Sequence, residues 1–202
     1  MLSRCVSTII AAGFAAVLAA PAQAQGTQPG TQPTPPTPAD IEAKAQMCAA
    51  CHGANGTPLD PKTMPNIWGQ QPYYILTQLV HYRNGMRENP VMASIAKTLQ
   101  QSDLRPLAAY FAAKPWPAGS NTPAAPAETP KGLTMCTPCH QANFQGGISW
   151  PRIAGLNYDY MVAAMRSFAN EERTNNMDMV KIMKLFSDSE RDAMARYLAA
   201  LK

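Results

Sequence analysis

Apolar residues recur at helical spacing along most of the chain, and no segment shows the alternation expected of a β-strand. The pattern predicts a short helix over 41–51 and a longer one, rich in Tyr and Leu, over 72–85. Two further apolar stripes each fit one face of a helix. They are Leu104, Leu107, Ala108 and Phe111, and then Met194, Tyr197, Leu198 and Leu201. The predicted fold class is all-α.

The starts of the last two helices can be predicted from capping residues. Ser187 and Glu190 have the spacing of a capping box, which places the start of the C-terminal helix at Ser187. For the helix with the first stripe, Ser102 is the favoured N-cap. Pro106 then falls in the first turn, where a missing N–H costs little.

The first residues have the organisation of a secretory signal peptide. Arg4 precedes an apolar stretch over 6–20, and Ala22-Gln23-Ala24 is a small-residue cleavage site. An uncleaved membrane anchor is the alternative, but the apolar stretch is shorter than the roughly 20 residues that span a bilayer. We therefore expect 1–24 to be removed and the protein to reach an oxidising compartment.

Two proline-rich stretches divide the rest of the chain. We interpret 25–39 as a spacer and 114–130 as an interdomain linker, each with five Pro. The remaining segments, 40–113 and 131–202, are predicted domains. Each is so short that a hydrophobic core alone is marginal. We expect something besides protein to complete each core.

The two predicted domains repeat each other. The repeat offset drifts only from 88 to 86 to 87 residues, which indicates a tandem duplication. The matching pairs are Cys48-Ala-Ala-Cys51-His52 with Cys136-Thr-Pro-Cys139-His140, Pro65 with Pro151, Tyr74 with Tyr160, and Arg87-Glu-Asn89 with Arg173-Thr-Asn175.

Each repeat contains a CxxCH motif, the attachment signature of c-type haem. Its two thiols can each bond one porphyrin vinyl group, and the adjacent His then becomes an iron ligand. The predicted groups are Cys48, Cys51 and His52 for one haem, and Cys136, Cys139 and His140 for the other. A zinc site built from the four Cys, a thioredoxin-like CxxC and a structural disulfide are the alternatives.

A methionine at a fixed later position favours haem over those alternatives, because the sixth ligand of an electron-transfer haem c is commonly Met. Met92 lies 40 residues after His52, and Met179 lies 39 residues after His140. Each precedes its terminal helix by eight residues, counted to Gln100 and Ser187. This agreement favours Met92 over Met64 and Met86, and Met179 over Met177 and Met183.

Some residues near the motifs allow a second interpretation. A backbone carbonyl near Pro65 or Pro151 could accept the Nδ1–H of the neighbouring His and fix its tautomer. His81 is the one His outside the motifs, and a solvent-facing helix position is its favoured interpretation. Arginines, Arg87 and Arg173 among them, could pair with haem propionates or remain solvated charges.

Charge gives little support to a nucleic-acid binder. Charged residues make up 15% of the chain, the formal charge is +4, and no block of Lys and Arg occurs.

Together these motifs resemble the cytochrome c4 family over about 40–202. The resemblance includes the duplicated CxxCH, the Pro downstream, the GQ…Y…QL run, the RxN before Met and the closing AAYF helix. It implies two tandem class I cytochrome c domains, each around a covalently attached haem c with His and Met on iron. A periplasmic location is also implied. One departure is that Gly69-Gln70 becomes Gly155-Leu156 in the second repeat.

The leading functional hypothesis is a single-electron carrier rather than an enzyme. The resemblance implies redox partners: a quinol-oxidising complex or dehydrogenase as donor, and a terminal oxidase as acceptor. Any membrane association is expected to be peripheral and through partners. The alternatives are a cytochrome subunit of a periplasmic dehydrogenase and a dihaem peroxidase, which needs an open iron position.

Overall fold

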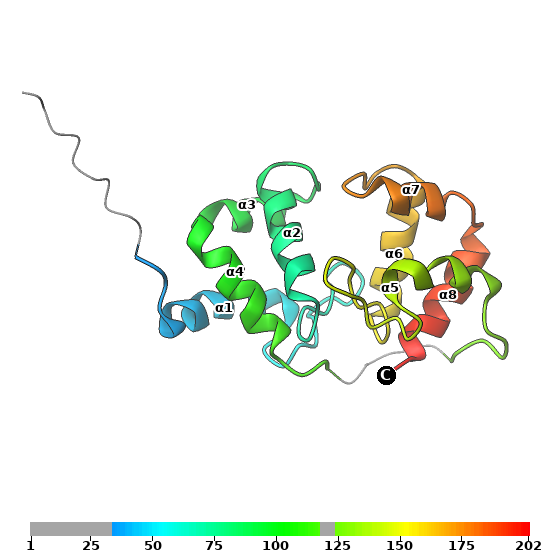
Figure 1. The fold of residues 1–202 in the computed structure, drawn as a ribbon, viewed down its shortest axis with the longest axis horizontal. Helices are drawn as coiled ribbons and strands as arrows, with labels where there is room; N and C mark the ends of the chain where they lie inside the picture. Colours follow the sequence, from blue (N-terminus) through cyan, green and yellow to red (C-terminus); the bar gives the residue numbers. More distant parts are fainter. Residues whose placement is uncertain (1–33, 118–123) are drawn as a thin grey trace, which may run out of the picture. The chain divides into compact units, whose positions relative to one another are not determined.

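The computed structural model describes residues 34–117 and 124–202. The predicted signal peptide, most of the predicted spacer, and residues 118–123 of the predicted linker lie outside these ranges. All regular structure in the described part is helical, which confirms the all-α prediction (Figure 1). No helix of this part is both long enough and apolar enough to cross a bilayer. The two repeats belong to one compact unit of the chain.

The first repeat contains four helices, α1 to α4, drawn from blue to green in Figure 1. They are α1 (Pro38–His52), α2 (Pro72–Arg83), α3 (Pro90–Thr98) and α4 (Gln101–Ala112). Helix α2 packs against α3 and α4, and α1 packs against α4. The helices predicted over 41–51 and 72–85 are confirmed, although α1 begins earlier because Thr37 caps it through the amide of Asp40.

The second repeat follows the same plan with a different first helix. Its elements are the 3₁₀-helix η1 (Lys131–Met135), α5 (Thr137–His140), α6 (Tyr158–Ala169), α7 (Met177–Met183) and α8 (Asp188–Ala200). Helix α6 packs against α7 and α8, and η1 contacts α8. The order of packing is therefore the same as in the first repeat, with α6, α7 and α8 in place of α2, α3 and α4.

Buried residues form two separate hydrophobic clusters, one in each repeat. The predicted stripe of α4 lies in the first cluster, where its four residues are at most 3% exposed. In the second cluster Met194 and Leu198 of α8 are buried, and Tyr197 and Leu201 pack against them. The helical periodicity of the sequence thus identified the core-facing side of both terminal helices.

The start of α4 differs from the prediction. Its N-cap is Gln100, two residues before Ser102, and Pro106 therefore lies inside the helix. The carboxylate of Asp103 accepts a 2.8 Å hydrogen bond from the Gln100 amide and a 2.6 Å contact from the Lys44 ammonium on α1. The contact with the Gln100 amide accounts for the earlier start, because a carboxylate at the third position of a helix can accept from the N-cap amide.

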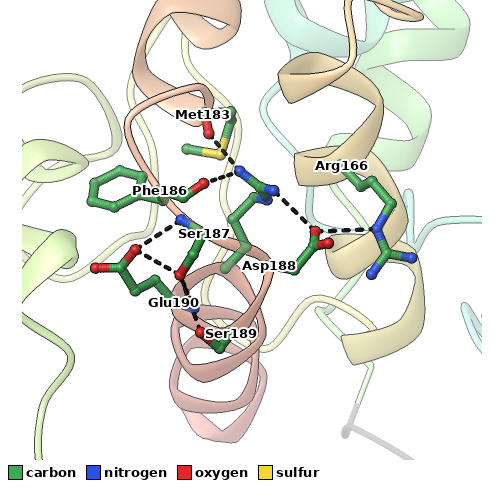
Figure 2. A network of polar contacts seen from close by, with 8 residues as sticks. Arg166, Met183, Phe186, Ser187, Asp188, Ser189 and Glu190 are labelled. Carbon is green, nitrogen blue, oxygen red and sulfur yellow. Dashed lines mark hydrogen bonds and ion pairs between the residues drawn. The ribbon is translucent and has the colours of Figure 1, made fainter.

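The capping box of α8 is confirmed (Figure 2). The Ser187 amide donates to the Glu190 carboxylate over 2.7 Å, and the Glu190 amide donates to the Ser187 hydroxyl over 3.3 Å. The N-caps of both terminal helices therefore lie eight residues after the predicted methionine of their repeat.

Candidate functional site

The two CxxCH motifs are held by different local structures. The first occupies the last turn of one continuous helix, α1. The second begins at Cys136, which lies at the break between η1 and α5. The helix breaks here because Pro138 has no N–H to bond a carbonyl of the preceding turn. The first thiol of each motif nevertheless faces the carbonyl four residues earlier, Cys48 at 3.9 Å from Lys44 and Cys136 at 3.8 Å from Gly132.

Both motif histidines are buried and oriented by a backbone carbonyl. His52 Nδ1 lies 2.9 Å from the Pro65 oxygen, and His140 Nδ1 lies 2.9 Å from the Pro151 oxygen. A carbonyl only accepts, so Nδ1 carries the proton and Nε2 keeps its lone pair. Burial lowers the pKa of both rings and favours this neutral form. The predicted role of the two proline carbonyls is confirmed.

The four motif cysteines are free thiols. Burial raises the pKa of Cys48 and of Cys136 to about 11. Thioredoxin-like motifs need the opposite shift, since a lowered pKa creates the reactive thiolate. Within residues 34–117 and 124–202, no three His, Cys, Asp or Glu side chains are grouped so that they could hold one metal ion. The redox-dithiol and zinc alternatives therefore find no support in the described part of the chain.

The predicted methionines occupy equivalent helical positions. Met92 and Met179 are each the third residue of their helix, and the amide of each donates to an N-cap asparagine. Met92 N lies 2.9 Å from Asn89 Oδ1, and Met179 N lies 3.0 Å from Asn176 Oδ1. Both side chains are half-buried.

The competing methionines have other surroundings. Met86 and Met177 are 53% and 51% exposed, and Met183 is buried in the core of the second repeat at 1%. Met64 is half-buried in the turn that precedes Pro65.

These caps correct one detail of the repeat alignment. The sequence pairs Asn89 with Asn175, but the residue with the same structural role as Asn89 is Asn176. The second repeat therefore has one additional residue between Arg173 and the start of α7. That residue, Asn175, has a different role, because its amide donates to Gln78 Oε1 over 3.0 Å.

Polar side chains from both repeats meet in one network, which sequence reasoning missed as a group. Arg87 donates to the Tyr160 hydroxyl over 2.9 Å, and Arg173 donates to the Tyr74 hydroxyl over 3.2 Å. These contacts are symmetric under the repeat, since each Arg meets the Tyr of the other half. His81 joins the network through Asn175, 2.9 Å away, and is half-buried. His81 is thus a helix residue that is partly exposed to solvent and has one side-chain partner.

Gln70 and its counterpart in the second repeat, Leu156, have different surroundings. The Gln70 side chain accepts from the Arg152 amide over 2.7 Å and donates to the Arg152 carbonyl over 2.9 Å. Gln70 is only 4% exposed, so this two-bond contact between the repeats is shielded from water. Leu156, its counterpart, lies in the hydrophobic cluster of the second repeat instead.

Trp116, within the predicted linker, packs against the second repeat. Its indole N–H donates to the Gly155 carbonyl over 3.3 Å, and the Arg152 guanidinium lies 4.3 Å from the ring centroid. A Cβ at Gly155 would lie 2.9 Å from the indole nitrogen, so the close approach requires glycine there.

Comparison with known proteins identifies the family. Residues 38–111 match the family described as cytochrome c oxidase, cbb3-type, subunit III. Cytochrome c4 of Azotobacter vinelandii is 34% identical, over 79% of this chain and 87% of the relative. The chain belongs to the cytochrome c4 family. A thiosulfate dehydrogenase electron acceptor of Stutzerimonas stutzeri is also related, with 30% identity over 93% of this chain and 92% of that protein.

The fold agrees with a solved cytochrome c4. The Acidithiobacillus ferrooxidans structure superposes with a TM-score of 0.69 at 28% identity, covering 78% of this chain and 99% of that chain. The class I cytochrome c fold of both repeats is thereby established. As a member of the cytochrome c4 family, the chain is a dihaem electron carrier with covalently attached haem c.

The described residues fit this cofactor. Each repeat contains two free thiols spaced for the vinyl groups, followed by a histidine whose Nε2 is available to a metal. The fit is equal in both repeats, which accounts for two haems per chain.

Proposed function

We propose that Cys48, Cys51 and His52 hold the first haem c, with Met92 as the sixth iron ligand. The second haem c is held by Cys136, Cys139 and His140, with Met179 as the sixth ligand. The observation that carries this proposal is the pair of 2.9 Å contacts from the histidines to the proline carbonyls. They fix in both repeats the neutral tautomer that an iron ligand requires.

The bound haem c supplies the one-electron couple of its iron. His52 with Met92, and His140 with Met179, would hold each iron in both redox states and so limit rearrangement on electron transfer. Methionine sulfur raises the reduction potential relative to a second histidine. With His and Met both bound, the iron would have no position open to a substrate, so these residues support a carrier.

Arg87 and Arg173 are suited to compensate the propionate charge. Both guanidiniums are half-buried, and none of the ion pairs in residues 34–117 and 124–202 includes either of them. Their hydrogen bonds go to neutral groups, which are the hydroxyls of Tyr160 and Tyr74 and the side-chain amides of Gln78 and Asn175. A half-buried cation with only neutral partners favours a nearby anion.

The proposed setting is the periplasm, after removal of 1–24. There the protein would accept electrons from a quinol-oxidising complex or a dehydrogenase and deliver them to a terminal oxidase. Encounters with these partners should be small and transient, as is usual for redox pairs.

An optical redox titration tests the proposal. The protein is exported in a host that matures c-type cytochromes, and the haem is counted per chain. We expect two low-spin haems at positive potential with the ferric Met–iron charge-transfer band present. One haem that is high-spin, or titrates far lower, would indicate an open iron position and would favour a peroxidase instead.

Methionine variants test the axial ligands. Met92→Ala is expected to make one haem high-spin and lower its potential, with both haems still covalently attached. Met179→Ala should do the same to the other haem. Met86→Ala and Met177→Ala are matched controls, because both side chains are half-exposed and should leave the spectrum unchanged. An unchanged low-spin spectrum in Met92→Ala would contradict the assignment.

A permanent place in a dehydrogenase complex is the second candidate. It is favoured by the 30% identity to a thiosulfate dehydrogenase electron acceptor over 93% of the chain. Purification of the untagged protein from its native host distinguishes the two. A catalytic subunit that co-elutes through two columns would support the complex, and elution as a free cytochrome would support the carrier.

A further inference from the structure

An arginine from α2 binds the end of the helix that carries Met92. Arg83 Nε donates to the Ala96 carbonyl over 3.0 Å, and Nη2 donates to the Leu99 carbonyl over 2.7 Å. Its Nη1 reaches Gln101 Oε1 over 2.8 Å. The last carbonyls of a helix have no partner within it, so one side chain here satisfies the end of α3 and the turn that leads to α4.

A second arginine, Arg191, does the same for the helix that carries Met179. Arg191 Nη1 donates to the Met183 carbonyl over 2.7 Å and also to the Phe186 carbonyl. Its Nη2 lies 2.9 Å from Asp188 Oδ1, which Arg166 of α6 contacts at 3.4 Å. Arg191 is only 9% exposed, and its Nε–H is buried without a partner among the described residues.

The two arginines bind equivalent carbonyls. Ala96 and Met183 each lie four residues after the proposed methionine ligand of their repeat, and Leu99 and Phe186 each lie seven residues after it. The first carbonyl is thus one helical turn beyond the methionine, and the second is in the turn before the terminal helix.

The arginines themselves are not equivalent. Arg83 is the last residue of α2, and the last residue of α6 is Ala169. Arg191 is the fourth residue of α8, and the fourth residue of α4 is Leu104. The same pair of carbonyls is therefore bound from different helices in the two repeats. Duplication of one sequence would have placed the two arginines at equivalent positions. Their different positions therefore indicate that both repeats require an arginine on these two carbonyls.

We propose that Arg83 and Arg191 are positioning residues, which hold Met92 and Met179 against iron by fixing the helices that carry them. The proposal rests on the His/Met ligation proposed above. A displacement of the short helix would take its methionine away from the iron. Displacing α3 or α7 breaks hydrogen bonds from a cation to two carbonyls, which are stronger than bonds between neutral groups.

Cyanide binding to the ferric holoprotein tests this idea, since cyanide can bind only where methionine has left the iron. Met92→Ala and Met179→Ala identify which kinetic phase belongs to which haem. Arg83→Gln should then increase the cyanide-binding rate of the first haem at least about tenfold, as expected for losing a hydrogen bond to a charged group. The rate of the second haem should remain unchanged. Arg191→Gln should give the reverse.

Control variants separate positioning from charge and from general stability. Arg105→Gln and Lys181→Gln remove exposed positive charges from α4 and α7 without touching the carbonyls, and should change neither rate. Arg83→Lys keeps the charge but not the two-pronged geometry, so it should give an intermediate rate. If Arg191→Gln fails to mature, Arg191→Lys and the Arg83 variants still decide the question.

Relocating the arginine is the strictest test. Ala169→Arg places an arginine in the second repeat where the first repeat has Arg83, and in the Arg191→Gln background it should restore a slow rate. Equal acceleration at both haems, or none in Arg83→Gln, would overturn the proposal. If Met92→Ala itself creates no fast phase, the methionine assignment has failed, and with it the basis for the positioning role.

Discussion

Asp103 shows how one buried carboxylate decides where a helix begins. It is 2% exposed and has two partners, the Lys44 ammonium and the Gln100 amide. Burial alone would raise the pKa of Asp103, but the hydrogen bonds from Lys44 and Gln100 outweigh it and lower the pKa below its usual 3.8. The ionised form is therefore the one that the fold stabilises.

Asp103→Asn should lower the free energy of unfolding by about 2 kcal/mol at pH 7, the value of a hydrogen bond to a charged group. A lowered folded-state pKa contributes stability that is present above about 3.8 and lost as pH falls through the folded value. The difference between wild type and variant should therefore shrink in acid. Denaturant unfolding of the holoprotein between pH 7 and pH 3 measures it, and a difference that stays constant would contradict this account.

The tautomer of each motif histidine is likewise set by a single residue, the proline whose carbonyl accepts from Nδ1. A carbonyl next to each proline was expected from the order of residues along the chain, and both contacts are present at 2.9 Å. The sequence succeeds here because the partner is a nearby backbone atom, 11 or 13 residues away, inside a repeated loop.

At the scale of elements, the N-caps of α3 and α7 establish which residues of the two repeats correspond. Asn89 and Asn176 each accept from the amide of the proposed methionine ligand. Sequence comparison paired Asn89 with Asn175 because it matched RxN as a motif. The structure distinguishes them by hydrogen bonding, since Asn175 contacts Gln78 and His81 of the first repeat.

Asn176→Ala should therefore destabilise α7 by about 1 kcal/mol, the usual cost of losing an N-cap. The Met–iron charge-transfer band of the second haem should be lost at a lower temperature than in wild type. Asn175→Ala is the matched neighbour, and should leave this temperature unchanged because it does not cap the helix. A larger drop in that temperature for Asn175→Ala than for Asn176→Ala would contradict the prediction.

The first elements of the two repeats also differ for a local reason. Cys48-Ala-Ala-Cys51 lies within one continuous helix, whereas Cys136 lies at the break between η1 and α5 and Cys139 lies in α5. Equivalent chemistry is thus presented from one long helix in the first repeat, and from one short helix and its N-cap in the second.

At the scale of the whole molecule, the repeats are joined by contacts that the duplication does not by itself provide. Gln70 binds both backbone groups of Arg152, while the equivalent Leu156 serves its own core. Tyr74, Arg87 and their counterparts add symmetric contacts. The repeats are therefore joined both by asymmetric contacts, such as that of Gln70, and by a symmetric pair of Arg–Tyr contacts.

Gln70→Leu should weaken the connection between the repeats. It removes the hydrogen-bond partner of both the amide and the carbonyl of Arg152, which costs about 2 kcal/mol. Denaturant unfolding followed separately at each haem should show the two transitions moving apart. Gln71→Leu, which loses only the 2.9 Å bond from Gln71 to the Gln145 carbonyl, should have a smaller effect. Transitions that stay together in Gln70→Leu would show that the other contacts suffice.

The sequence by itself determined the helical class, the duplication, both CxxCH motifs and the helical stripes that form the cores. These features are local or periodic, so neighbouring residues contain all the information that they need. The favoured position of each methionine was likewise deduced from two spacings that agree.

Only the tertiary structure decided which side chains act between distant segments. Asp103 in the first turn of α4 pairs with Lys44, 59 residues away, and Gln70 contacts Arg152 at a separation of 82 residues. Arg83 and Arg191 bind equivalent carbonyls from non-equivalent positions, so no comparison of the repeats could have paired them. Such contacts depend on how helices pack in space, and packing is determined by the whole fold rather than by any one stretch of sequence.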